Sequence, residues 1–273
     1  MQGAHACRVH LRSLAMSRMG GVVLVALIGG MGAVPQRDQE AMRAPTRLHV
    51  RLNARGHPWS NLNDGVELPT IYIGAAMARE ALEQGVVRPA ALTSADFDED
   101  GVLDLVSGYV GPAGGLLTLH RGNGDFLWPN DVQGRARQAA GRLVNAPFWP
   151  EAVVVELPEP PDFLEAGDFD ADGHADVIAA VRGGQMLYVL RGDGRGGWHG
   201  LHTIELPGQA TAFAVGEVNR ADGLADIVVG VIGREGPCVL IFESPEGALR
   251  REPERISLPD EATALALGQL DEG

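Results

Sequence analysis

The stretch Asp96-Phe-Asp-Glu-Asp-Gly-Val-Leu-Asp104 decides the fold of this chain, because its pattern returns twice more. The second copy is Asp168-Phe-Asp-Ala-Asp-Gly-His-Ala-Asp176, and a looser third copy is Glu217-Val-Asn-Arg-Ala-Asp-Gly-Leu-Ala-Asp226. Each copy runs directly into a short apolar segment: Leu-Val-Ser-Gly, Val-Ile-Ala-Ala or Ile-Val-Val-Gly. Short runs rich in β-branched residues predict buried strands. The repeated unit is therefore an acidic loop followed by a strand.

The first two loops have carboxylates at positions 1, 3, 5 and 9 and glycine at position 6. Calcium takes about six to eight oxygen ligands, one of them a backbone carbonyl at position 7, and the glycine permits the sharp turn. The predicted ligands of the first loop are Asp96, Asp98, Asp100, Asp104 and the carbonyl of Val102. Those of the second loop are Asp168, Asp170, Asp172, Asp176 and the carbonyl of His174. Those of the third loop are Glu217, Asn219, Asp222 and Asp226.

Two other interpretations of the loops fit the sequence less well. A solvated acidic turn explains one copy, since Asp and Gly favour turns, but it does not explain two near-identical copies. An EF-hand needs a bidentate Glu at position 12 and a following helix, whereas position 12 is Ser107 or Ala179 and a strand is expected next. The third loop has an extra residue between Asn219 and Asp222, so whether it binds metal stays open.

The self-similarity extends beyond the loops. A Leu-Pro pair ends at Pro158, Pro207 and Pro259, and each proline stands nine residues before a glycine. These glycines are 49 residues apart and then 52 (Gly167, Gly216, Gly268), and a fixed period of this size indicates a solenoid or propeller. Four short strand candidates fall in each unit, which is the number in a propeller blade.

The two tight loops and the strands after them resemble the FG-GAP/VCBS repeat, over roughly residues 90 to 273. That family builds calcium-binding β-propellers, including the head of integrin α chains and many bacterial secreted proteins. The resemblance implies an all-β fold with blades at 88–158, 159–207 and 208–259 and a partial blade at 260–273. A complete propeller would have about seven such blades, within the usual range of about four to eight. Because the last motif is interrupted at Gly273, we expect a C-terminally truncated fragment of a bacterial secreted member.

The N-terminal 33 residues have the organisation of a secretory signal peptide. Arg8, Arg12 and Arg18 precede an apolar segment at 22–28, and small residues lead to a cleavage site after Ala33. An uncleaved anchor is the alternative, although the apolar run is short for a membrane span. We therefore expect a secreted or cell-surface protein with no membrane span in the mature chain and an N-terminal extension at 34–87.

Composition narrows the choice of partners. The net charge of −14 argues against nucleic acid and anionic membrane surfaces. Removal of the signal peptide would remove Cys7 and leave Cys238 alone, so no disulfide is expected within the mature chain. Structural Ca²⁺ would take the stabilising role instead.

No motif in the chain predicts catalysis. The glycine-rich segment 192–197 matches a dinucleotide-binding pattern, but a strand is expected after it where such a site needs a helix. His199 and His202 would point to opposite faces of that strand, which disfavours joint metal ligation. Trp128 and Trp149 flank an insertion in the first repeat. They are the better candidates for a ligand platform, although local packing is the favoured interpretation of both.

The function expected from the resemblance is a calcium-binding scaffold without catalytic activity, which binds a protein or carbohydrate at the cell surface. The alternative is that the propeller belongs to a larger secreted enzyme whose catalytic domain lies outside this chain.

Overall fold

The computed structural model describes strands at 25–28, 49–51 and 59–61, residue 68, and residues 70–128, 131–144, 146–218 and 222–268. The chain divides into two units, one of residues 1–29 with 70–273 and one of residues 30–69. In the second unit, β2 (His49–Arg51) pairs with β3 (Trp59–Asn61) in an antiparallel ladder.

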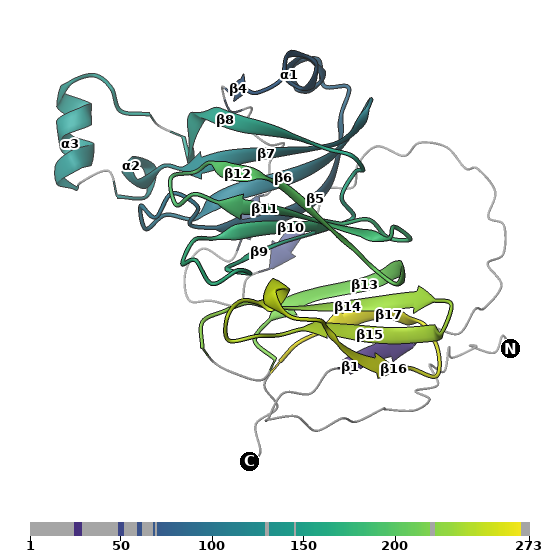
Figure 1. Ribbon diagram of the computed structural model, residues 1–273. Helices are drawn as coiled ribbons and strands as arrows, with labels where there is room; N and C mark the ends of the chain where they lie inside the picture. The colour runs from purple at the N-terminus through teal and green to yellow at the C-terminus, as the bar shows by residue number, and fades with distance from the viewer. Residues whose placement is uncertain are drawn as a thin grey trace, which may run out of the picture. The chain divides into compact units, whose positions relative to one another are not determined.

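The described residues are mostly β, with three antiparallel sheets that resemble propeller blades (Figure 1). The first sheet contains β5 (Arg88–Ala95), β6 (Asp104–Gly111), β7 (Gly114–Gly122) and β8 (Phe148–Leu157). The second contains β9 (Phe163–Gly167), β10 (Asp176–Ala180), β11 (Met186–Gly192) and β12 (Trp198–Glu205). The third contains β13 (Gly208–Gly216), β14 (Asp226–Gly233), β15 (Gly236–Phe242) and β16 (Glu254–Ser257).

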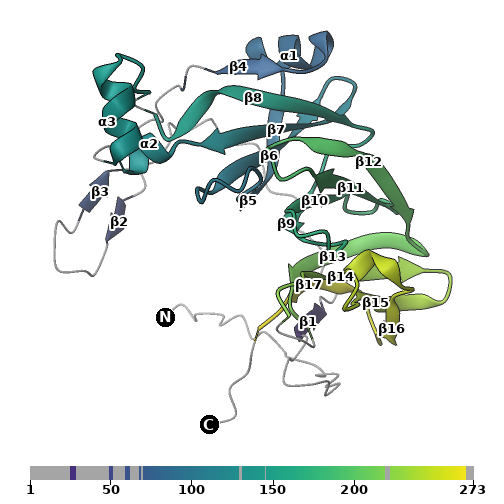
Figure 2. The same cartoon turned by 60° about the vertical axis from the view of Figure 1, so that its left-hand side comes forward.

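The three sheets follow one another along the chain and in space (Figure 2). The first strands of consecutive sheets are neighbours, β5 beside β9 and β9 beside β13, as in a propeller. The next first strand, β17 (Ala262–Ala266), lies against β13 and pairs with β1 (Val25–Ile28). The described residues form no closed propeller.

Packing between sheets explains the continuous apolar runs in the sequence. Every residue of β10 is buried, because one face of the second sheet packs on the first sheet and the other on the third. Phe97 and Leu119 belong to the first interface, and Phe169 and Leu240 to the second. A strand buried on both faces needs no polar alternation.

The outer faces of the end sheets are covered as well. Helix α1 (Ala76–Glu83) packs Ala78, Ala81 and Leu82 on the first sheet, where β4 (Ile71–Ile73) joins β8 in parallel. β17 covers part of the third sheet through Leu265. None of the described helices is long and apolar enough to cross a membrane.

The insertion in the first sheet lies between β7 and β8 and contains α2 (Gly124–Leu127) and α3 (Val132–Ala139). Buried Asp125 forms an ion pair with Arg137, whose guanidinium lies 5.7 Å from the centre of the Trp149 ring. Trp149 is thus engaged within the insertion, whereas Trp128 is 56% exposed. Trp198 packs edge-on against Phe97, with ring centres 5.2 Å apart.

Apart from β1, the predicted signal peptide lies outside the described residues, as does about half of the extension at 34–87. Strand β1 falls within the predicted signal peptide, and only its backbone pairing with β17 is described. Cleavage after Ala33 and export therefore stay predictions.

Candidate metal centres

Each acidic loop connects the first and second strands of its sheet. The loops therefore follow β5, β9 and β13 and end where β6, β10 and β14 begin. Position 4 of the first two loops is left-handed in a residue that is not glycine: Glu99 has φ +57° and Ala171 φ +60°. Position 6 is also left-handed, at Gly101 (φ +87°) and Gly173 (φ +90°), where glycine carries no steric cost. The matching backbone shows that both loops take the same turn.

Hydrogen bonds from the backbone to loop carboxylates maintain that turn. The position-1 carboxylates of Asp96 and Asp168 each accept the N–H of the position-6 glycine at 2.9 Å. The position-5 carboxylates of Asp100 and Asp172 each accept the position-7 N–H at 2.9 Å.

The third loop is closed by similar bonds despite its extra residue. Gly223 N–H donates to Glu217 at 3.2 Å, and Leu224 N–H donates to Asp222 at 3.1 Å. The predicted ligand Asn219 lies outside the described residues.

The position-9 carboxylates lie where loop and sheet meet, and they are almost fully buried. Asp104 accepts N–H bonds from Phe97 at 2.9 Å and Gly122 at 2.7 Å. Asp176 accepts the corresponding bonds from Phe169 at 3.1 Å and Gly192 at 2.9 Å. Each of these two position-9 residues therefore connects position 2 of its own loop to the end of the third strand of its sheet.

In the third loop, Asp226 likewise accepts the N–H of Val218 at 2.8 Å. Burial raises the pKa of Asp104, Asp176 and Asp226 to about 6, although the N–H bonds act in the opposite direction. These carboxyls are therefore held in surroundings that disfavour their charge.

Two triads of carboxylates have ligand atoms that lie within 4.8 Å of one another: Asp96, Asp98 and Asp104, and Asp168, Asp170 and Asp176. Within them, Asp98 Oδ1, Asp168 Oδ1 and Asp170 Oδ1 are buried without a hydrogen-bond partner. Buried carboxylate oxygens without a partner are costly unless a cation satisfies them. An all-oxygen donor set with unsatisfied atoms fits a hard divalent cation such as Ca²⁺.

The structure thus brings together loop positions 1, 3 and 9 in the first two copies. Asp100 and Asp172, at position 5, lie outside the two triads and point an oxygen at the position-7 N–H. Burial also raises the pKa of Asp100. Their role as metal ligands, and that of the Val102 and His174 carbonyls, stays a prediction.

Two arginines contact the triads and were not predicted from the sequence. Arg121, at the end of β7, forms an ion pair with Asp98, and Arg191, at the end of β11, lies 3.1 Å from Asp170. A signal for them is present in the sequence, since each stands directly before Gly122 or Gly192 in matching hairpin segments.

The loops also contact the following sheet. The carbonyl of Phe97 accepts the N–H of Gly196 at 3.0 Å, and the carbonyl of Phe169 accepts the N–H of Leu249 at 3.3 Å. Glu99 at the tip of the first loop lies 2.6 Å from His174 of the second loop, which raises the His174 pKa. The conformations of the first and second loops are therefore coupled to the sheets that follow them.

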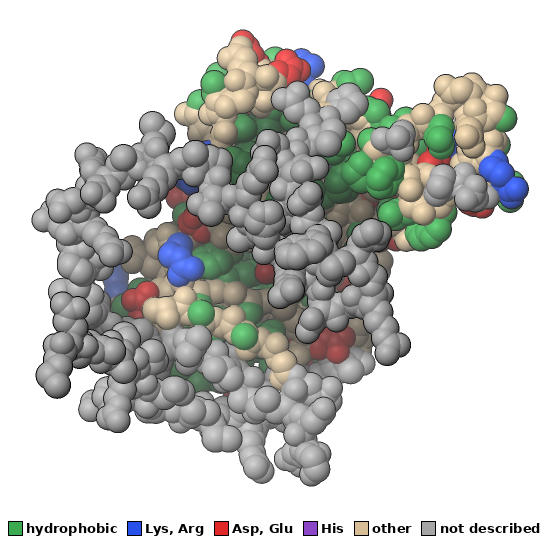
Figure 3. All heavy atoms as spheres, turned by 180° about the vertical axis from the view of Figure 1, so that it is seen from behind, with side chains coloured by type: hydrophobic (Ala, Val, Ile, Leu, Met, Phe, Trp, Pro, Cys, Tyr) green, Lys and Arg blue, Asp and Glu red, His purple; other side chains and the backbone are tan. Residues whose placement is uncertain are grey.

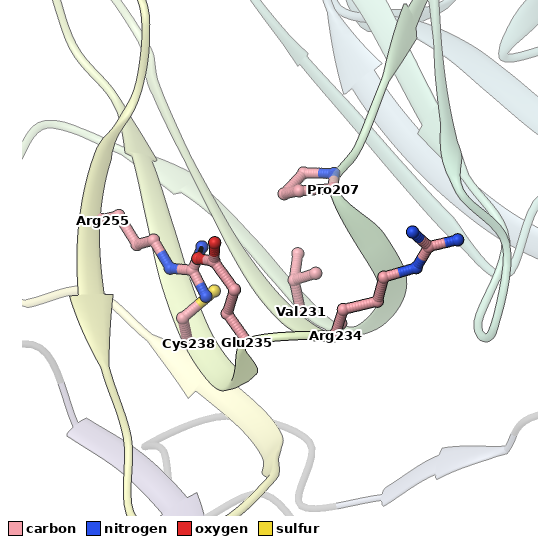
Figure 4. Close-up of a pocket in the computed structure, with 7 residues that line it drawn as sticks. Pro207, Val231, Arg234, Glu235, Cys238 and Arg255 are labelled. Atoms are coloured by element: carbon pink, nitrogen blue, oxygen red, sulfur yellow. Dashed lines mark hydrogen bonds and ion pairs between the residues drawn. The ribbon is translucent and has the colours of Figure 1, made fainter.

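Three pockets in the described residues lie apart from the carboxylate triads. One of about 220 Å³ at the β14–β15 hairpin is lined by Pro207, Val231, Arg234, Glu235, Cys238 and Arg255 (Figure 4). Glu235 and Arg255 form an ion pair there, and burial raises the pKa of the Cys238 thiol.

A second pocket, of about 350 Å³, borders α1, near which hydrophobic side chains are visible from behind (Figure 3). A third, of about 720 Å³, lies between the end of β12 and the segment around Arg250. None of these three pockets contains a residue of either triad.

Comparison with known proteins agrees with this geometry. A family model described as an FG-GAP-like repeat matches residues 168–229, from the start of the second loop into β14. No curated protein matches the chain. The matched segment contains the complete second triad and the described part of the third loop. Residues 168–229 of this chain are an FG-GAP-like repeat.

Proposed function

We propose that this chain is a Ca²⁺-binding β-propeller segment of the FG-GAP type, which serves as a binding scaffold outside the cell and not as a catalyst. The observation that supports it best is the pair of matching triads, each with buried carboxylate oxygens that lack a partner. Such oxygens at the same loop positions in two repeats are what a structural cation would satisfy.

The bound ion would act on stability. A cation that binds the folded loops and not the unfolded chain raises the free energy of unfolding by mass action. It would offset the repulsion within each triad and hold the start of β6 or β10 against the preceding strand. The scaffold's ligand would be a protein or a carbohydrate, and the exposed Trp128 in the insertion is one surface available to it.

Calcium titration of the full chain by calorimetry tests the proposal. We expect about two ions per chain, with dissociation constants in the range of about 10⁻⁴ to 10⁻³ M that is common for extracellular modules. Asp170→Ala should abolish uptake at the second loop, whereas Asp162→Ala, in the β8–β9 connection, should leave it unchanged. Folded protein that takes up no calcium would refute the proposal.

A further inference from the structure

The carboxylate at loop position 3 has a cationic neighbour from its own sheet. Arg121 contacts Asp98 Oδ2 through both Nε and Nη2, and Arg191 Nε lies 3.1 Å from Asp170 Oδ2. The aspartate side chains are only 3% and 5% exposed, whereas the arginines are 46% and 38% exposed. The arginines therefore reach from solvent to a carboxylate that is shielded from it.

The contact is a property of the repeat. The first residue after each loop, Leu105 or Val177, pairs with a residue on the third strand of its sheet, His120 or Leu190. Arg121 and Arg191 come directly after these paired residues. The two arginines therefore occupy equivalent positions in the two sheets. In both copies the arginine contacts Oδ2 of the position-3 aspartate, Asp98 or Asp170. The other oxygen of that aspartate, Oδ1, is buried without a hydrogen-bond partner. Two independent copies of one contact are unlike a chance surface ion pair.

Charge balance gives the contact a role. Three carboxylates close together repel one another in surroundings that shield them from water, and a guanidinium lowers that repulsion. A divalent cation among the same oxygens would lower it too, but the two cations would repel each other. Arginine and metal are therefore alternative partners for one group of charges, and each weakens the binding of the other.

We propose that Arg121 and Arg191 are internal counter-ions, which stabilise the calcium-free loops and weaken calcium binding to them. This inference rests on the proposed function. Because both arginines are partly exposed, they can turn toward solvent when the metal binds. The third sheet has an acidic residue at the position equivalent to the two arginines. Ile227, the first residue after the third loop, pairs with Phe242, and the residue that follows Phe242 is Glu243. The counter-ion thus belongs to the two loops whose carboxylates form triads.

The test compares Arg191→Gln with Arg182→Gln in the full chain. Both remove one positive charge from the second sheet, but Arg182 lies at the other end of β10, over the Phe163 ring at 4.7 Å. Calcium titration calorimetry should show about two- to fivefold tighter binding at one site in Arg191→Gln, the size expected for a partly exposed ion pair. Arg182→Gln should change the dissociation constant less than about twofold, because salt screens distant charges.

Two further measurements sharpen the test. In chelator, Arg191→Gln should unfold at lower denaturant than the wild type, and Arg191→Lys should restore both the stability and the weaker binding. Arg121→Gln should repeat the effect at the first loop, which keeps the test valid if Arg191→Gln does not fold.

Unchanged or weaker calcium binding in folded Arg191→Gln and Arg121→Gln would overturn the inference, since damage to the loop or loss of orientation can only weaken binding. That outcome leaves the proposed function intact. Absence of calcium uptake by the wild-type chain overturns both.

Discussion

Gly192→Ala is expected to disrupt the second calcium loop from outside the loop sequence. Gly192 ends β11, and a Cβ atom there would lie 2.1 Å from the carbonyl oxygen of Ala175, which is loop position 8. Ordinary carbon–oxygen contacts are about 3.3–3.6 Å, so β11 or the loop must move by more than about 1 Å. Both are backbone, and neither can turn aside as a side chain would.

The expected cost has two parts. Overpacking of a fitted contact costs about 1–3 kcal/mol. The movement also breaks the Gly192 N–H bond to buried Asp176, and a buried carboxylate that loses a donor costs about 1–3 kcal/mol more. The free energy of unfolding should therefore fall by about 2–6 kcal/mol. Because Asp176 belongs to the second triad, calcium affinity at that loop should fall as well.

Gly183→Ala is the matched control. Gly183 follows β10 with φ +82°, and a Cβ there would meet nothing within 4 Å. Only the backbone strain of a left-handed alanine remains, about 1–2 kcal/mol, and calcium binding should not change.

Urea denaturation with and without calcium measures both variants, and calorimetry measures the affinity. If Gly192→Ala proved no less stable than Gly183→Ala, or bound calcium at both loops as the wild type does, the close approach of β11 to the loop would be wrong.

Three other changes probe the remaining features. In protein freed of metal, the pKa of each position-9 carboxyl is raised from 3.8 to about 6 in the folded state, so its contribution to stability is present below pH 3.8 and lost as pH rises through 6. The free energy of unfolding should therefore fall by about 1.3 kcal/mol per carboxyl between pH 5 and pH 7. A rise in the denaturation midpoint over this range would contradict it. Thr211→Val should cost about 1 kcal/mol in thermal unfolding, because the buried hydroxyl donates to Ala262 O at 2.7 Å, and an unchanged Tm would show that this bond does not hold β17. Cys238 is 2% exposed, so in a Cys7→Ser chain its thiol should react with a thiol reagent only as fast as the third sheet opens. Labelling at the rate of a free thiol would exclude its burial.

The loops and their strands were predictable because both depend on local sequence. The aspartate spacing determines which side chains can converge within one turn, and the run from Val177 to Ala180 is apolar throughout because both faces of its sheet are covered. The FG-GAP resemblance is confirmed for residues 168–229.

The contacts that could not be predicted from the sequence depend on the register between paired strands. The contacts of Arg121 and Arg191 with the loops follow from the pairing of the second and third strands, which spacing alone does not specify. For the same reason the close approach of Gly192 to Ala175 could not be foreseen. The blade-like sheets are present, the described residues close no ring, and the seven-bladed propeller stays a prediction.

The N–H groups of Gly196 and Leu249 donate to the carbonyls of Phe97 and Phe169, so each of these bonds joins a loop to the sheet after it. Each repeat thus completes the surroundings of its predecessor's loop, and stability propagates as in a linear array with nearest-neighbour coupling. Duplication of a whole repeat would preserve every such junction between a loop and the next sheet. A deletion that begins within one sheet and ends within the next would leave a loop without the turn that donates to its carbonyl. Gains and losses of length in relatives should therefore come in whole repeats or in segments such as the α2–α3 insertion, which leaves these junctions untouched.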